Sequence, residues 1–141
     1  MNKHPFRTIG ALALTTIAVG GALSHTASAS PNMAILAQSA TAPQSQAQIS
    51  ARIAATMAAG QTGYDGWQCG GPAGGIAIRD RASDSGQELG RMYNGTGLHV
   101  YATHSSQANI PLGWALGYGR PNGGTAIKGY FKNAWVSRTP C

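Results

Sequence analysis

Carboxylates are scarce in this chain: its 141 residues include four Asp and Glu against ten Lys and Arg. General acid–base catalysis needs positioned titratable side chains. Asp80, Asp84 and Glu88 recur every four residues, but they fall in an expected loop and strand, where that spacing defines no common face. The sequence also lacks the Gly-x-Ser-x-Gly turn of serine hydrolases and the Gly-rich phosphate loop. It therefore predicts no enzyme, no catalytic residue and no cofactor.

Long apolar runs are also scarce, and the one that is present occupies residues 9–23. It follows the basic residues Lys3 and Arg7 and precedes the small residues Ala27-Ser28-Ala29. This order is typical of a secretory signal peptide, and the run is shorter than the roughly 20 residues of a membrane-spanning helix. We expect residues 1–29 to be a signal peptide and the remainder to be secreted, extracellular or associated with the cell wall. An uncleaved anchor is the alternative.

Clustered positive charge is absent as well. Without Lys3 and Arg7, eight basic and four acidic residues remain, and the basic ones form no run. Nucleic-acid-binding proteins usually have a clustered basic face, so the sequence predicts no nucleic-acid partner. A modest positive excess instead favours contact with anionic surfaces such as cell-wall polymers.

The chain has only two cysteines, Cys69 and Cys141, and two histidines beyond residue 29, His99 and His104. In an exported chain two cysteines are expected to form one disulfide, here closing a long loop that contains most of the second half. A reactive or metal-bound thiol pair is the weaker alternative, because there is no Cys-x-x-Cys. With the thiols oxidised, too few ligands remain for a metal site, and none is predicted.

Residues 30–63 contain no aromatic residue and are rich in Ala, Gln, Ser and Thr. Such a segment buries little apolar surface, which favours a flexible low-complexity linker. However, Ile49, Ile53 and Met57 recur every four residues, and Gly60 could end a helix. We therefore expect a leader that is either flexible or weakly helical.

Residues 64–141 have the opposite composition, with many aromatic residues and frequent glycine. Alternating apolar residues predict short strands, and on one of them Leu98, Val100 and Ala102 should share a face. Asn94-Gly95 predicts a hairpin with a type I′ turn, and residues 121–124 predict a second turn. Five strands at short spacing are typical of a small all-β barrel or sandwich. The expected strands lie near residues 76–79, 89–92, 98–102, 114–118 and 126–131, with Trp135-Val136 completing the set.

The order of these pieces resembles a bacterial Src-homology-3-like domain, over about residues 75–137. An alternating strand that ends in Arg79 is followed by a polar loop, a Gly-bearing strand and the turn Asn94-Gly95-Thr96. A Trp-led strand at Trp114 and the motif Gly129-Tyr130-Phe131 come later. The resemblance implies a five-stranded barrel whose first and last strands lie close together, which suits a Cys69–Cys141 bridge. Two departures concern the loops: Arg81-Ala82 replaces the usual Gly-Pro, and residues 103–113 are longer than the usual connection.

The resemblance also implies a ligand groove between the opening loop and the later strands. Tyr and Trp suit such grooves because they combine apolar area with a polar tip. We expect Trp114, Tyr118 and Tyr130 as its walls, with Arg79 and Asp80 as polar contacts. Burial in the core is the alternative for the aromatic residues and the favoured expectation for Trp135.

Two functions fit this reading. The first is a monomeric, secreted, non-catalytic module that recognises cell-wall peptide or glycan, without stable membrane insertion. The second is a secreted effector or inhibitor that acts on a partner protein through the loop at residues 103–113, with Ile110-Pro111-Leu112 as a rigid apolar tip. Long ordered loops often carry function.

Overall fold

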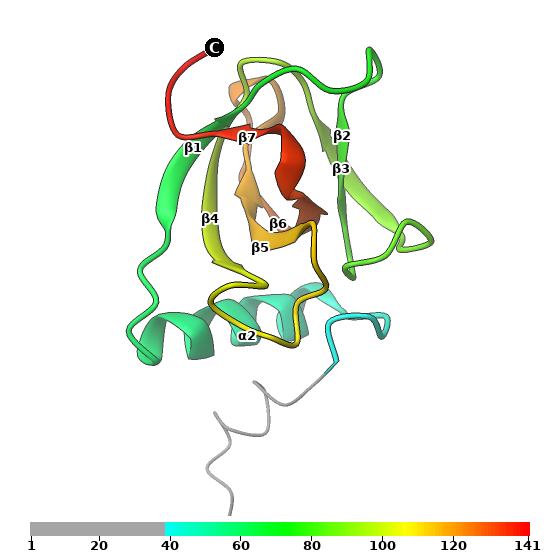
Figure 1. The fold of residues 1–141 in the computed structure, drawn as a ribbon. Coiled ribbons are helices and arrows are strands. Elements are labelled where there is room, and N and C mark those ends of the chain that lie inside the picture. The colour runs from blue at the N-terminus through cyan, green and yellow to red at the C-terminus, as the bar shows by residue number, and fades with distance from the viewer. Residues whose placement is uncertain (1–38) are drawn as a thin grey trace, which may run out of the picture.

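The computed structural model describes residues 39–141, so the expected signal peptide lies outside the described part of the chain. Residues 39–141 form one α-helix and seven strands (Figure 1). The elements are α2 (Gln46–Ala58), β1 (Tyr64–Gln68), β2 (Ile76–Arg79), β3 (Glu88–Met92), β4 (Gly97–Thr103), β5 (Trp114–Gly119), β6 (Ile127–Lys132) and β7 (Val136–Ser137), with short 3₁₀ turns at Pro121–Gly123 and Asn133–Trp135. Nowhere in this range is there a helix long and apolar enough to span a bilayer.

Helix α2 begins and ends with sequence-encoded caps. The side chain of Ser45 accepts a hydrogen bond from the Gln48 amide, and the Gln48 side chain accepts one from the Ser45 amide, which is a capping box. At the other end Gly60 adopts a φ of 83°, and its amide and that of Gln61 bond back to the last turn. Of the two alternatives for this segment, the structure has the helix. Ile49 and Ile53 of the expected apolar stripe are buried, whereas Met57 is exposed.

The strands form one antiparallel sheet in the order β3-β2-β6-β5-β4-β1-β7. The β-rich fold is thus as expected, but the number of strands is not five. The sequence does not predict strand β1, because Asp65 and Gly66 interrupt its apolar pattern. Gly66 is nevertheless required there, since a β-carbon at that position would lie 2.7 Å from the Ser137 carbonyl oxygen of β7. The strand order is open, with β3 and β7 at its two ends.

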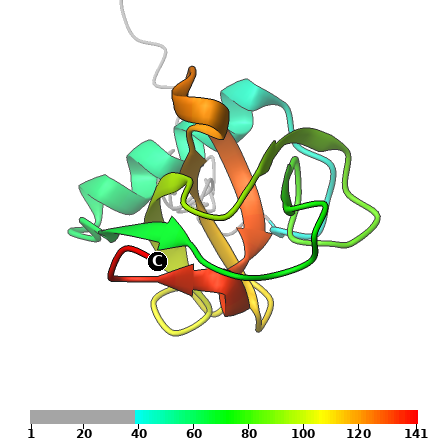
Figure 2. The same ribbon diagram turned by 90° about the horizontal axis from the view of Figure 1, so that it is seen from above.

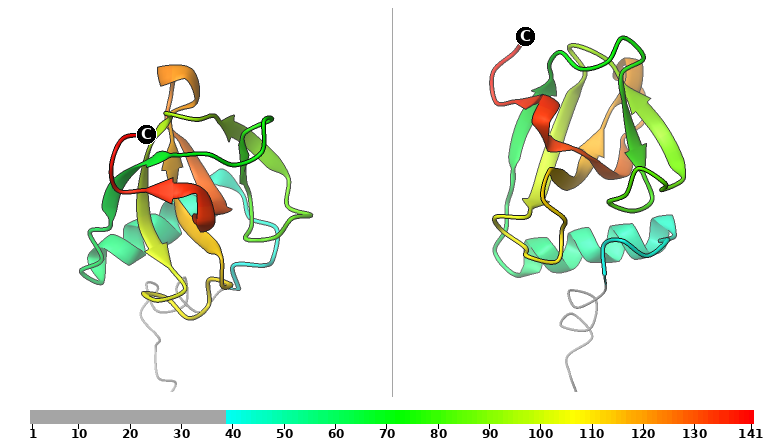
Figure 3. Two further views of the ribbon diagram at one scale, coloured as in Figure 1. Left: turned by 45° about the horizontal axis from the view of Figure 1, so that its top comes forward. Right: turned by 45° about the vertical axis from the view of Figure 1, so that its right-hand side comes forward.

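The strands form a curved, twisted sheet (Figure 2, Figure 3), and two apolar clusters of buried residues pack against it. In the view from above, α2 lies on the opposite side of the central strands from β7. The cluster beneath α2 consists of Ala40, Ile49, Ile53, Ala82, Ala102, Ile110, Trp114, Leu116 and Tyr130. The cluster inside the curve consists of Ile76, Ile78, Met92, Leu98, Val100, Ala115 and Phe131.

Two local predictions need correction. Leu98 and Val100 share the inner cluster, but Ala102 belongs to the cluster under α2. The cause is a register shift in β4 between Val100 and Ala102, because an extra residue in a strand breaks the alternation of its faces. The turn at Asn94-Gly95 is present, but it forms no hairpin, because the strands on its two sides, β3 and β4, are not neighbours in the sheet. Gly95 alone has a positive φ, so the turn is not of type I′ either. Both central residues of the second turn, Asn122 and Gly123, have positive φ, as type I′ requires.

The two cysteines are bonded, as expected: Cys69 and Cys141 form a disulfide with a Cα–Cα distance of 5.6 Å. Cys69 directly follows β1, and β7 pairs with β1 shortly before the chain reaches Cys141. The pairing of β1 with β7 therefore places the two cysteines next to each other.

Candidate binding cleft

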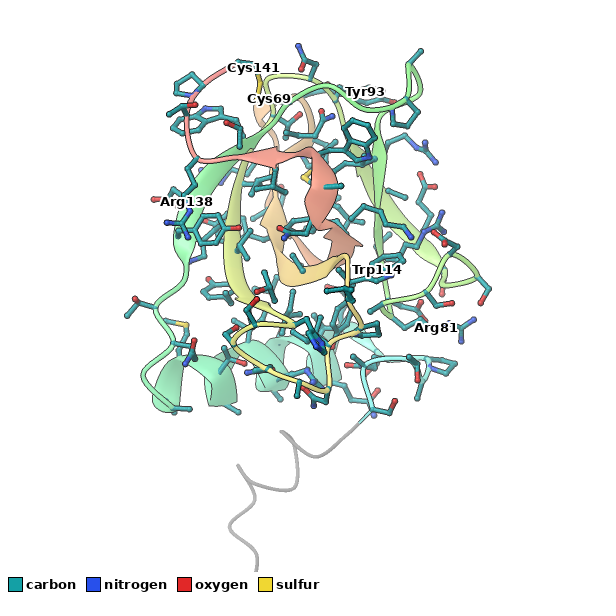
Figure 4. All side chains as sticks on the ribbon, viewed as in Figure 1. Cys69, Arg81, Tyr93, Trp114, Arg138 and Cys141 are labelled. Carbon is teal, nitrogen blue, oxygen red and sulfur yellow. A yellow bond between two sulfur atoms is a disulfide. The ribbon has the colours of Figure 1, made fainter. Side chains whose placement is uncertain are left out.

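The structure brings two of the five predicted site residues, Arg79 and Trp114, together in one cleft of about 230 Å³. The cleft lies between the β2–β3 pair and the segment that runs from β6 to the 3₁₀ turn before β7. Trp114 stands at the start of β5, facing the β2–β3 side (Figure 4). The residues that line the cleft are Pro72, Gly75, Ile76, Ala77, Arg79, Asp84, Arg91, Trp114, Lys132 and Trp135.

Trp114 forms a closed wall of this cleft. Its side chain is 6% exposed, and the Lys132 Nζ lies 4.4 Å from the centre of its ring. The same ammonium group is 3.0 Å from Asp84 Oδ2. A lysine held over an indole face is a cation–π contact, so a ligand that stacks on this face of Trp114 must first displace Lys132.

Trp135 provides the open aromatic surface. Its side chain is 41% exposed, so the expectation that it fills the core is wrong. The ring packs over the backbone at Gly71, where a β-carbon would lie 3.4 Å from it. Gly71 has a φ of 90°, a conformation that glycine adopts without strain. The glycine-rich loop thus supports the indole from one side and leaves the rest accessible.

Two guanidinium groups, those of Arg79 and Arg91, line the cleft. Arg79 donates from Nη1 to the Gly86 carbonyl at 2.7 Å, which fixes it against the loop between β2 and β3. Arg91 makes two hydrogen bonds to the Glu88 carboxylate and one to the Gly74 carbonyl at 2.9 Å. This pairing with Arg91 lowers the pKa of Glu88. Both arginines are therefore oriented before any ligand arrives.

Asp80 and Tyr130 lie elsewhere. Asp80 is buried, and its Oδ1 accepts a hydrogen bond from the Gln87 amide at 2.7 Å, which closes the loop between β2 and β3. Tyr130 is fully buried under α2, where its hydroxyl lies within hydrogen-bond distance of Gln44. Burial raises the pKa of Tyr130, although the charge of Arg52 and the contact with Gln44 oppose this. Neither residue lines the cleft.

Tyr118 belongs to an aromatic group on β4 and β5. Its ring is nearly parallel to that of His99 at 5.7 Å, and Tyr101 lies 4.5 Å from His99. His99 Nδ1 is 2.7 Å from Asp65 Oδ1, an arrangement found in catalytic triads. Its Nε2, however, is 3.0 Å from the Thr62 carbonyl oxygen. Since that nitrogen is already engaged, His99 is not placed to act as a general base.

The loop at residues 103–113 is fastened to the helix. The Gln107 side chain donates to Thr56 Oγ1 at 2.7 Å, and His104 Nδ1 is 2.8 Å from the Ile110 carbonyl oxygen. Ile110 is fully buried, whereas Leu112 is 83% exposed. The expected apolar tip is therefore divided, with one residue in the core and one on the surface.

No cluster of three or more potential metal ligands occurs within residues 39–141. A comparison with known proteins finds no matching family model, no matching curated protein and no matching solved structure.

Proposed function

We propose that this protein is an exported, monomeric, non-catalytic binding module that attaches to anionic peptide or glycan of the bacterial cell wall through the cleft. The composition of the cleft carries the proposal: two tryptophans and three cationic side chains line it, and of the cations Arg91 is paired with Glu88 and Lys132 with Asp84, whereas Arg79 has no carboxylate partner among residues 39–141. Guanidinium groups recognise carboxylates by paired hydrogen bonds, and the exposed face of Trp135 suits an apolar or sugar face.

Export and the Src-homology-3-like barrel are parts of this proposal. The disulfide supports export, because such bonds persist mainly in oxidising compartments. The antiparallel pairing of β4, β5 and β6, extended by the β2–β3 pair, supports the barrel. In this arrangement β1 and β7 are additions joined by the disulfide.

The test is retention on purified peptidoglycan at moderate salt, measured by sedimentation. Trp135→Ala and Arg91→Ala should each reduce the retained fraction several-fold. Arg81→Ala is the matched control, because it removes the same charge from a residue that lies outside the cleft. If the wild-type protein stays in solution, or if Arg81→Ala is as damaging as Arg91→Ala, the cleft is not a specific wall-binding site.

A second candidate function is action on a partner protein through the loop at residues 103–113. The observation that favours it is the exposed Leu112 on a loop that is otherwise held in place. Under this proposal Leu112→Asp abolishes inhibition or toxicity towards a target cell without changing the thermal midpoint. A variant that keeps full potency excludes this role for the loop.

A further inference from the structure

A second hollow, of about 340 Å³, lies over β1, β4 and β5 and shares no lining residue with the cleft. It belongs to the part of the sheet where Asp65, His99 and Tyr118 lie opposite one another on adjacent strands. Its lining consists of Asp65, Gly66, Trp67, Gly97, Leu98, Tyr118 and Arg120.

The hollow exists because position 97 has no side chain. Gly97 lies directly opposite Trp67 in the β1–β4 pairing, but the indole does not fold over it, since a β-carbon at Gly97 would meet no atom within 4 Å. Gly97 has no positive φ, so its backbone does not require glycine. Glycine weakens a strand interior and often marks a place where a ligand approaches closely. Neither packing nor backbone conformation therefore explains why position 97 is a glycine. A glycine there does keep the surface between Trp67 and Tyr118 open, and we call this surface the floor of the hollow.

The walls of the hollow combine aromatic and charged groups. The half-buried rings of Trp67 and Tyr118 border it. The guanidinium carbon of Arg120 lies 5.8 Å from the centre of the Tyr118 ring. Within residues 39–141 the Arg120 side chain takes part in no ion pair, and its backbone amide bonds to the Gly97 carbonyl at 3.2 Å. The backbone of Arg120 is thus held beside Gly97, and its guanidinium group has no carboxylate partner within residues 39–141.

Asp65 provides an oriented acceptor. Its side chain is 81% exposed, and its Oδ1 is held by His99 Nδ1 at 2.7 Å. One class of ligand, the sugars, matches this arrangement. The hollow has a carboxylate at one rim, a guanidinium group at another, and aromatic rings beside its open floor. A sugar ring has an apolar C–H face that packs on aromatic rings, and its hydroxyls donate to carboxylates. The guanidinium adds a preference for an acidic substituent, because it pairs strongly with carboxylates.

We propose that this hollow binds a saccharide that carries a carboxylate. The sugar ring packs over Gly97 between Trp67 and Tyr118, its hydroxyls donate to Asp65, and its carboxylate pairs with Arg120. This site is separate from the cleft and does not depend on it.

The test is a titration of the oxidised full chain, followed by the backbone amide resonances. The probes are the disaccharide of N-acetylglucosamine and N-acetylmuramic acid and, as its neutral counterpart, N,N′-diacetylchitobiose (below, chitobiose), which lacks the lactyl carboxylate. The acidic disaccharide should shift the amides of Trp67, Gly97 and Arg120 to saturation and bind at least five-fold more tightly than chitobiose.

Four variants complete the test. Gly97→Leu fills the hollow and should abolish the saturable shifts while the thermal midpoint stays at or above that of the wild type. Arg120→Gln should bring the affinity for the acidic disaccharide down to that for chitobiose, whereas Arg81→Gln should not. Trp135→Ala, which alters only the cleft, should bind as the wild type does. Equal affinity for both sugars, absence of saturable shifts at the hollow, or unchanged binding in Gly97→Leu overturns the proposal.

Discussion

Tyr130 and Trp135 have exposures opposite to those that the sequence predicts. Both are aromatic residues in the last quarter of the chain, yet Tyr130 is fully buried and Trp135 is 41% exposed. Tyr130 faces α2, which lies about 80 positions earlier, and Trp135 rests on the backbone at Gly71. Residue type predicts only that large aromatic side chains are often buried. Which of the two is buried depends on these contacts with residues distant in the sequence.

The buried phenol predicts how stability changes at alkaline pH. In the unfolded chain a tyrosine ionises near pH 10, whereas burial raises the pKa of Tyr130 in the folded state. The contribution of Tyr130 is therefore constant below about pH 10 and is lost as the pH rises further, at no more than about 1.4 kcal/mol per pH unit. Urea unfolding at pH 8 and pH 10.8 should show a smaller loss in Tyr130→Phe than in the wild type.

Two other tyrosines serve as references for this measurement. Burial also raises the pKa of Tyr101, so part of the alkaline loss should persist in Tyr130→Phe. Tyr93 is 44% exposed, and Tyr93→Phe should lose as much stability as the wild type. An identical alkaline loss in Tyr130→Phe and the wild type would show that Tyr130 does not cause the effect.

Helix α2 and strand β4 show which features of an element are local. The ends of α2 follow from short patterns, since Ser45-x-x-Gln48 is a capping box and Gly60 stops the helix. The spacing of Ile49 and Ile53 gives the buried face. Strand β4 is different, because the irregular pairing between Val100 and Ala102 depends on how β5 lies against it. Counting by two along β4 therefore assigns Ala102 to the wrong side.

The packing of α2 predicts that the leader contributes to stability. Ile53 is 4% exposed in the cluster beneath the helix, so Ile53→Ala should lower the free energy of unfolding by about 2–4 kcal/mol. Met57 is 53% exposed on the same helix, and Met57→Ala should change it by less than about 0.5 kcal/mol. Denaturant titration measures both. Equal, small effects would mean that α2 is a detachable appendage.

At the scale of the whole molecule, the sequence predicts the individual helices, strands and turns better than the way in which they pack together. The antiparallel strands and the Cys69–Cys141 bond are as predicted, and the helix near Ile49 and Ile53 is one of the two alternatives that the sequence leaves open for the leader. The β1 strand is missed because Gly66 serves the close approach of β7 rather than an apolar pattern. The hollow over Gly97 is missed as well, because a glycine needed for open space looks in a sequence like a glycine needed for a turn.

The disulfide predicts a large change in stability on reduction. It links positions 72 residues apart, and chain-entropy arguments give about 4 kcal/mol of stabilisation for a loop of this length. The double variant Cys69→Ser/Cys141→Ser should therefore unfold at a much lower denaturant concentration than the oxidised protein. Reduced wild-type protein should match the double variant. Superimposable unfolding curves for the oxidised and reduced forms would contradict this prediction.

The same bond has a consequence for how the protein survives cleavage. Strands β2 to β7 all lie between Cys69 and Cys141. A protease that hydrolyses one peptide bond anywhere in that interval produces two polypeptides but not two molecules, because sulfur still connects them. Each half keeps its neighbour within reach and can rejoin the sheet, so a nick becomes a permanent loss only when a reductant follows it.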